Sequence, residues 1–126
     1  MKEPSPNFER PECPIEATVS LIGGKWKTVI LWKLKDDKLR FNQLMAEMPA
    51  ISPKMLTKQL RELELDGLVT RKIYPEIPPR VEYSLTPKAD SLMPILVDMA
   101  KWGVANIEGR SWMGCRPSKS QLAPKE

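Results

Sequence analysis

The sequence predicts an α+β fold that is mainly helical, and three observations support this prediction. Apolar residues recur at three- and four-residue spacing in several segments, which is typical of amphipathic helices packed on a shared core. Two short runs, 69–74 and 80–85, alternate more apolar and more polar residues, as strands do. The residues between these runs, PEIPP, include three prolines and favour a stiff turn. A chain of 126 residues then fits one domain with a single core.

The stretch ISPKMLTKQLRELELDGLV at 51–69 predicts a helix with well-marked ends. Ser52 supplies an N-cap hydroxyl, Pro53 suits the first turn, and Gly67 suits the left-handed position after the last turn. The predicted helix therefore runs from Pro53 to Asp66. At 100° per residue, its core-facing side carries Leu56, Leu60 and Leu63. Its opposite side carries Lys54, Thr57, Lys58 and Arg61.

A short helix over 42–48 and a proline-containing turn at 49–52 precede this cationic helix, and the alternating ribbon follows it. This order is the layout of a winged helix-turn-helix. In that layout the second helix enters the major groove of DNA and the ribbon reaches the adjacent backbone. We therefore expect the segment Lys72 to Arg80 to act as the wing.

Two further helices are predicted outside this unit. The first begins at Pro14 with Cys13 as its cap, carries the stripe Ile15, Val19 and Ile22, and ends at Gly23 and Gly24. The last begins after the cap Thr86, contains Pro94 as an expected kink, and runs to about Ile107.

The apolar stripes of these outer helices exceed what one small domain covers, which predicts a homodimer. Two-fold symmetry would place the two cationic helices about 34 Å apart and demand a palindromic operator. The expected domain organisation is an N-terminal arm at 1–12, the DNA-binding domain at 13–107, and a mobile tail at 108–126.

A helix from about Lys25 to Leu34 lies between the first helix and the helix-turn-helix. Its lysines Lys25, Lys27 and Lys33 are expected to face solvent or phosphate. The aromatic and aliphatic residues of the domain are interpreted as core, with a ligand pocket as the alternative. The residues in question are Trp26, Phe41, Leu44 and Tyr83.

The net charge of +4 is concentrated around the cationic helix. Residues 25–72 hold eleven Lys or Arg against six Asp or Glu, a balance of +5 that leaves −1 for the rest. Such an excess favours polyanion binding through counterion release, although a solvated helix face is the alternative. Charge alone does not decide between them.

The composition also limits which kinds of functional site the chain can form. Histidine is absent and only two cysteines are present, so a Cys/His zinc site and a histidine-based triad are excluded. A thiol redox enzyme lacks a second cysteine at motif spacing. We expect no cofactor, no metal and no enzymatic activity. Without a long apolar run or a signal-peptide core, a cytoplasmic protein without a membrane span is predicted.

The candidate DNA-binding residues form two sets. Base contacts in the major groove are assigned to the cationic helix and its cap, namely Ser52, Lys54, Thr57, Lys58 and Arg61. Phosphate contacts, which fix register without reading sequence, are assigned to Lys25, Arg40, Lys72 and Arg80.

Several motifs together resemble the HxlR-type family of winged helix-turn-helix regulators, relatives of the MarR group. They are Cys13-Pro14, IGGKWKTVILW at 22–32, RFNQL at 40–44, ISPKMLTKQLRELELDGLV at 51–69, YPEIPPRVEYSLT at 74–86 and WG at 102–103. Ala89 departs from the glycine usual in the family. The resemblance implies a homodimeric transcription factor whose terminal helices form the dimer interface. It also implies a sensor cysteine for electrophiles, aldehydes or oxidants at the position of Cys13.

From the residues alone, the reactivity of Cys13 is undecided, because a helix N-terminus favours its thiolate while Glu12 and Glu16 oppose it. Cys115 is interpreted as an incidental thiol, with pairing to Cys13 as the alternative. The predicted function is sequence-specific transcriptional regulation, as a repressor, with activation left open. The alternative is a winged-helix module for protein interaction or architectural DNA binding without a specific operator.

Overall fold

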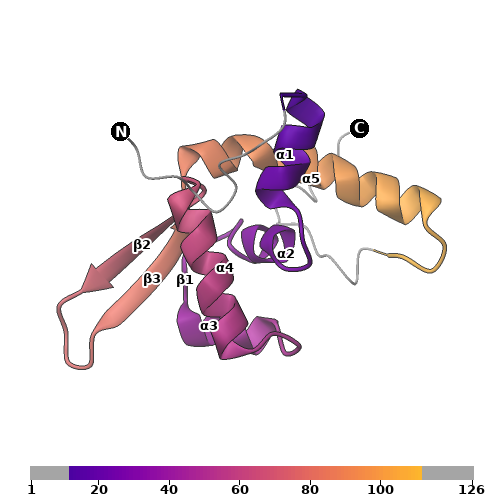
Figure 1. Ribbon diagram of the computed structural model, residues 1–126. Coiled ribbons are helices and arrows are strands. Elements are labelled where there is room, and N and C mark those ends of the chain that lie inside the picture. Colours follow the sequence, from indigo (N-terminus) through magenta and orange to yellow (C-terminus); the bar gives the residue numbers. More distant parts are fainter. Residues whose placement is uncertain (1–11, 112–126) are drawn as a thin grey trace.

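The computed structural model describes residues 12–111 and contains five helices and three strands within that range. Figure 1 shows these elements along the chain. The helices are α1 (Pro14–Ile22), α2 (Lys27–Lys33), α3 (Phe41–Glu47), α4 (Pro53–Leu65) and α5 (Pro87–Asn106). The strands are β1 (Leu39–Arg40), β2 (Val69–Tyr74) and β3 (Arg80–Leu85). This mainly helical winged-helix architecture confirms the predicted fold class.

The predicted element boundaries hold with small shifts. Helix α2 begins two residues later than expected, since the chain first turns through Gly24, whose φ of 90° is a left-handed conformation that favours glycine. Helix α3 begins at Phe41 because the backbone N–H of Arg40 donates to Oε1 of Gln43, at 2.7 Å, and anchors its first turn. Helix α5 continues through Pro94, so this proline does not end the helix.

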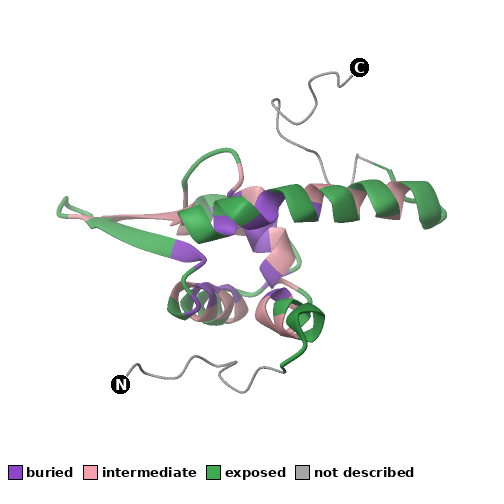
Figure 2. Ribbon diagram, turned by 90° about the horizontal axis from the view of Figure 1, so that it is seen from above, coloured by how far each residue is buried: buried purple, intermediate pink, exposed green. Residues whose placement is uncertain are grey.

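The three strands form one antiparallel sheet in the order β1-β3-β2. Strand β1 contributes a two-residue pairing, with Leu39 opposite Tyr83. Strands β2 and β3 pair along their whole length, from Val69 opposite Leu85 to Tyr74 opposite Arg80. The β2–β3 ribbon extends beyond the helical part of the molecule (Figures 1 and 2). The loop 75–79 at its far end is the wing tip.

The core lies where α2, α3, α4 and the first part of α5 meet the inner end of the ribbon. Its buried side chains include the leucines predicted for the inner face of α4 and apolar residues of every neighbouring element. The fully buried ones are Ile30, Leu31, Leu44, Leu56, Leu63, Leu68, Val69 and Ala89, and Leu60 is 2 % exposed. Burying each large aliphatic side chain contributes about 1.5–3 kcal/mol, so this cluster holds α4 firmly against the body.

The apolar face of the ribbon is buried only at its inner end. Val69 is 1 % exposed, whereas Ile73, on the same strand, is 57 % exposed. Strand periodicity predicts which residues share a face, but it does not predict how far a ribbon extends past the core. The predicted apolar face of β2 is therefore exposed to solvent in the outer half of the strand.

The outer helices also keep apolar side chains in solvent. Ile15 and Val19 of α1 are 74 % and 60 % exposed, and Trp102 of α5 is 63 % exposed. The second half of α5 extends away from the body, and most of its surface is exposed (Figure 2). Among residues 12–111, no helix is long and apolar enough to cross a membrane. The predicted arm and tail fall mainly at 1–11 and 112–126, outside the described residues.

Candidate nucleic-acid interface

Helix α4 is held at both ends by hydrogen bonds, of which the sequence predicts the cap at its N-terminal end. The Ser52 hydroxyl accepts a hydrogen bond from the backbone N–H of Met55 at 3.1 Å, as an N-cap should. At the other end Gly67 has φ 78°, and its carbonyl accepts a hydrogen bond from the Thr86 hydroxyl at 2.7 Å. Nζ of Lys88 donates to the carbonyl of Asp66 at 3.1 Å. The start of α5 is thereby fastened to the end of α4.

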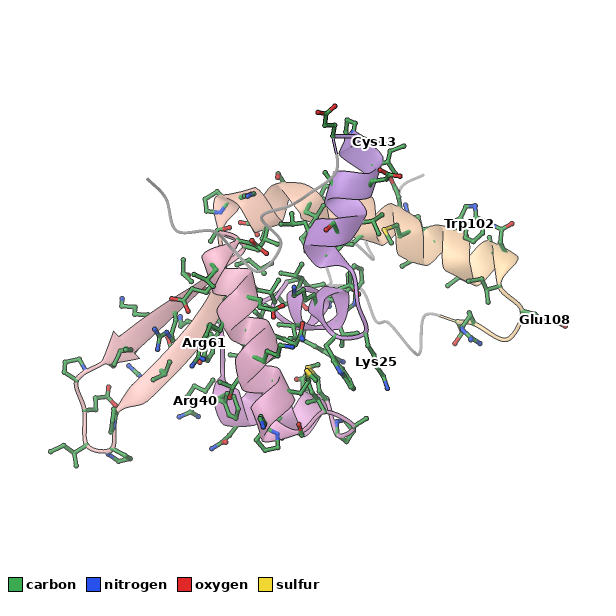
Figure 3. All side chains as sticks on the ribbon, in the orientation of Figure 1. Cys13, Lys25, Arg40, Arg61, Trp102 and Glu108 are labelled. Atoms are coloured by element: carbon green, nitrogen blue, oxygen red, sulfur yellow. The ribbon has the colours of Figure 1, made fainter. Side chains whose placement is uncertain are left out.

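The outer face of α4 carries the side chains assigned to the major groove. All five are exposed: Ser52, Lys54, Thr57, Lys58 and Arg61. Figure 3 shows Arg61 and Arg40 on the half of the molecule that holds α3 and α4. Cys13 and Trp102 lie on the opposite half, with α1 and α5. The chain therefore separates a cationic side from an apolar side.

Both acidic residues of α4 are paired with cations from other elements. Oε1 of Glu62 lies 2.7 Å from Nζ of Lys27 on α2, and Oε1 of Glu64 lies 3.4 Å from Nε of Arg71 on β2. Within residues 12–111, the three cations of α4 form no ion pair of their own; these are Lys54, Lys58 and Arg61. The outer face of α4 therefore keeps its positive charge uncompensated.

Lys27 corrects one expectation from the sequence. It was expected to face solvent or phosphate, but it is 5 % exposed, and its ammonium group meets Glu62 inside the protein. A lysine can lie along an apolar surface and still reach a partner, because its long aliphatic stem packs while its charge is neutralised. Periodicity places Lys27 on α2 correctly, but it contains no information about the carboxylate on α4.

The wing carries two of the predicted phosphate contacts, and they differ in availability. Lys72 is exposed, with Nζ 4.9 Å from the centre of the Tyr74 ring. Nη2 of Arg80 lies 3.1 Å from Glu76, and its Nε lies 3.7 Å from Glu82. Arg80 also covers the Tyr74 ring at 4.0 Å. Most of the Arg80 charge is thus engaged within the wing.

The other two predicted phosphate contacts lie at the edges of the cationic side. Arg40 is exposed just before α3, and Lys25 is exposed just before α2, with Nζ 4.9 Å from the Trp26 ring centre. Within residues 12–111 neither side chain forms an ion pair. Figure 3 shows both on the same half of the molecule as Arg61. The geometry therefore brings them to one side with the recognition helix.

A hollow of about 510 Å³ lies between α4 and the sheet, and Tyr83 forms part of its wall. Partial burial raises the pKa of the Tyr83 phenol above its ordinary value of 10.0. Arg71 lowers this pKa, Glu64 raises it, and Arg61 lowers it to a smaller extent. The pattern of pairs around this hollow involves three elements, so spacing within one helix could not predict it.

The side chains weighed as a possible ligand pocket do not meet in one cavity. Leu44 is fully buried, while Trp26, Phe41 and Tyr83 are partly buried and pack against the core. Trp26 lines a hollow of about 450 Å³ between α2 and α5, whereas Phe41 borders a separate one beside the wing tip. Within 12–111, no group of three or more His, Cys, Asp or Glu residues could hold a metal ion. The core interpretation therefore fits these side chains better.

Cys13 occupies the predicted N-cap position of α1, and its thiol is exposed and free. Its side chain forms no cap hydrogen bond, so the thiol is not fixed against the helix terminus. Glu16 lies in the first turn of the same helix. Cys115, and with it the question of pairing, lies outside the described residues.

The fold and the uncompensated cationic face of α4 define a winged helix-turn-helix protein of the transcriptional-regulator class. The chain belongs to the HxlR-like helix-turn-helix family, which matches residues 21–111. The match begins within α1, so Cys13 lies before it.

Relatives and solved structures agree with this assignment. A helix-turn-helix transcriptional regulator of Methanothermobacter thermautotrophicus is 53 % identical over 91 residues, covering 72 % of this chain and 70 % of its own length. The redox regulator HypR in its reduced form has a TM-score of 0.73 at 47 % identity, with 75 % and 94 % of the two chains covered. The reduced form of the regulator YodB from B. subtilis has a TM-score of 0.70 at 35 % identity, with 80 % and 100 % covered.

Proposed function

We propose that this protein is a homodimeric, sequence-specific DNA-binding repressor that acts by binding and carries out no catalysis. The observation that carries the proposal is the neutralisation of Glu62 and Glu64 by Lys27 and Arg71. Because both carboxylates of α4 are paired with cations of other elements, the free charges that this helix offers to DNA are all positive. Repression is the expected outcome, since a dimer bound over a promoter excludes the polymerase.

The roles of the individual residues follow from their chemistry. Arg61 and the two lysines of α4 present donors suited to guanine O6 and N7, while Thr57 offers a methyl group to thymine. Ser52 caps the helix with its oxygen and keeps its O–H for a nearby acceptor. Lys25, Arg40 and Lys72 are the stronger phosphate contacts. Arg80 is the weaker one, because Glu76 and Glu82 already engage it.

Arg61→Ala and Lys72→Ala test these roles on a duplex that the wild-type protein selects from a random-sequence pool. Arg61→Ala should weaken specific binding by about 1–3 kcal/mol and relax the preference at one base position. Lys72→Ala should weaken specific and random duplexes alike and reduce the salt slope by about one. Fluorescence anisotropy over a salt series measures both quantities.

Lys101→Ala is the matched control, because Lys101 is an exposed lysine in the second half of α5, outside α4 and the wing. It should leave affinity and salt slope unchanged. Equal binding by the wild type and Arg61→Ala would refute the placement of α4 in the major groove. A wild-type protein that selects no sequence, yet shows a steep salt slope, would instead favour the architectural DNA-binding alternative.

The proposed dimer uses the apolar side formed by the outer helices. On α5, the exposed side chains Ile95, Met99 and Trp102 recur at four- and three-residue spacing and therefore share one face. A second copy of the chain is the occupant that would pair two recognition helices across a palindrome. Trp102→Glu should lower the mass measured by light scattering from dimer to monomer. A dimer that persists would contradict the use of this face.

Residues 13–107 would form the working domain, with the arm at 1–12 and the tail at 108–126 outside it, and the protein would act in the cytoplasm, where its DNA is. A reporter placed behind the selected operator should rise in activity when the protein is deleted. A fall in reporter activity would identify an activator instead.

We further propose that Cys13 is a regulatory thiol. It is exposed and begins the helix whose apolar face, Ile15 and Val19, is part of the proposed dimer surface. Similar solved structures include a redox regulator in reduced and oxidised forms. Cys13→Ser should keep operator binding under diamide or a quinone, whereas the wild type should lose it. Equal responses of the two proteins would contradict sensing, and non-reducing mass analysis would show whether Cys115 pairs with Cys13.

A further inference from the structure

The wing tip holds the most exposed large apolar side chain in the described part of the chain. Ile77 is 101 % exposed, while the other exposed large hydrophobic residues reach at most 74 %. An isoleucine side chain in water does not gain the favourable free energy that accompanies burial of its apolar surface. No neighbour within the fold covers Ile77, so the fold itself gains nothing from its apolar side chain.

The loop that presents Ile77 is held in shape by local contacts. The backbone N–H of Glu76 donates to the Tyr74 carbonyl at 2.8 Å, and the Glu76 carboxylate lies 3.1 Å from Nη2 of Arg80 across the loop. Arg80 in turn lies over the Tyr74 ring. Prolines at 75, 78 and 79 restrict the remaining backbone freedom. Binding through this loop would therefore lose little conformational entropy.

The same contacts pair the one charge that the loop itself carries. Glu76 is the only acidic residue of the loop, and the Arg80 ion pair cancels its charge. Arg80 follows the loop and is also engaged by Glu82, while two further cations lie nearby, Lys72 beside the Tyr74 ring and Arg40 across the hollow that Ile77 lines. The loop residues 75–79 themselves therefore offer no cation to a phosphate. The contribution of the loop to an interface must come mainly from apolar contact.

The length of the ribbon brings this tip to the neighbouring groove. Six residues per strand at about 3.3 Å each carry the loop roughly 20 Å away from the C-terminal end of α4, to one side of the helix (Figure 1). Adjacent major and minor grooves are separated by half of a helical turn, about 17 Å. Figure 1 shows the ribbon extending from the body beside α4. When α4 occupies the major groove, the tip therefore reaches the adjacent minor groove.

We propose that Ile77 enters this minor groove and packs against the deoxyribose walls, which makes the wing tip an apolar reader of groove shape. This inference rests on the proposed DNA-binding function. The minor groove is about 6 Å wide and presents few distinguishing hydrogen-bonding groups, so an uncharged side chain there senses width and deformability more than base identity. Minor-groove binding proteins do place apolar side chains in this groove, where they often act as wedges between base steps.

Ile77→Ser tests the proposal on the duplex that the wild-type protein selects from a random pool. We expect operator affinity to fall about tenfold. The slope of affinity against salt should stay at the wild-type value, because an apolar contact releases no counterions. Hydroxyl-radical protection of the sugars in the flanking minor groove should disappear. Protection of guanine N7 in the major groove should persist.

Ile77→Leu and Lys72→Ala are the matched variants. Ile77→Leu keeps the apolar bulk and should bind within about twofold of the wild type, whereas Lys72→Ala should lower the salt slope. Thermal unfolding of Ile77→Ser should match the wild type, because a fully exposed side chain makes no packing contact. Wild-type affinity or persistent sugar protection in Ile77→Ser would overturn the inference. Loss of every footprint in the wild type itself would instead defeat the proposed function.

Discussion

The ion pair between Lys27 and Glu62 is the contact that joins α2 to the middle of the recognition helix. Its N–O distance is 2.7 Å, and the two side chains are 6 % and 18 % exposed. At an effective dielectric constant of about 20, the gross attraction is roughly 6 kcal/mol. Desolvation of both groups offsets most of it, so the net worth of the intact pair is small.

Removing one partner should lower the free energy of unfolding, because the other charge is then left unpaired inside the protein. Glu62→Met strands the more buried ammonium group and should lower the free energy of unfolding by about 3 kcal/mol. Lys27→Met strands a carboxylate that is 18 % exposed and can turn toward water, so it should cost only about 1 kcal/mol. The double variant Lys27→Met, Glu62→Met should also cost about 1 kcal/mol, which gives a coupling energy near 3 kcal/mol.

Urea unfolding followed by circular dichroism measures these values, at one protein concentration because dimerisation would add to the apparent stability. The pair Lys33–Glu47 provides the control, with a distance of 3.9 Å and side chains 33 % and 51 % exposed. Lys33→Met should change the free energy of unfolding by at most about 0.5 kcal/mol. A cost below about 1 kcal/mol for Glu62→Met, or equal coupling energies for the two pairs, would contradict the burial of the Lys27 charge as the cause.

Three further predictions concern the ends of α4 and the hollow beside it. Ser52→Ala removes the N-cap acceptor for Met55 and should cost about 1 kcal/mol in urea unfolding, while Ser52→Asp should largely retain stability. Gly67→Ala places a Cβ at φ 78° and should cost about 1–2 kcal/mol, and an unchanged midpoint would argue against that turn. The pKa of Tyr83 in the folded state is raised above 10.0. The protonated phenol therefore contributes fully to the free energy of unfolding below about pH 10, and this contribution is lost as the pH rises through the folded-state pKa. Stability should therefore decline more steeply above about pH 10 in the wild type than in Tyr83→Phe, and phenolate absorbance measures the titration.

Much of the fold was predictable because local rules determine it. The caps Ser52 and Thr86 both accept hydrogen bonds in the structure, and the helices they start begin at the expected prolines. The leucines of α4 are buried as their spacing indicates, since a helix can bury only one of its faces. The assignment of exposed cations to the opposite face follows from the same periodicity. These features depend on neighbours within a few residues along the chain.

The charge state of that cationic face was decided by the tertiary structure. Glu62 and Glu64 are paired with residues 35 and 7 positions away, on a different helix and on a strand. Spacing within α4 shows where these carboxylates emerge, but not which cation meets them. The same limit explains Lys27, which the pattern placed in solvent and the structure buries. It also explains Arg80, whose partners come from the wing loop and its own strand.

The sequence by itself therefore determined the elements, their order, their caps and the faces they bury, because these depend on short-range sterics and hydrophobic periodicity. Only the tertiary structure decided which charges remain free for DNA and how far the wing extends past the core. It also decided which apolar side chains, such as Ile77, Ile15 and Trp102, remain without cover. These properties arise from contacts between elements distant along the chain, which no local pattern encodes.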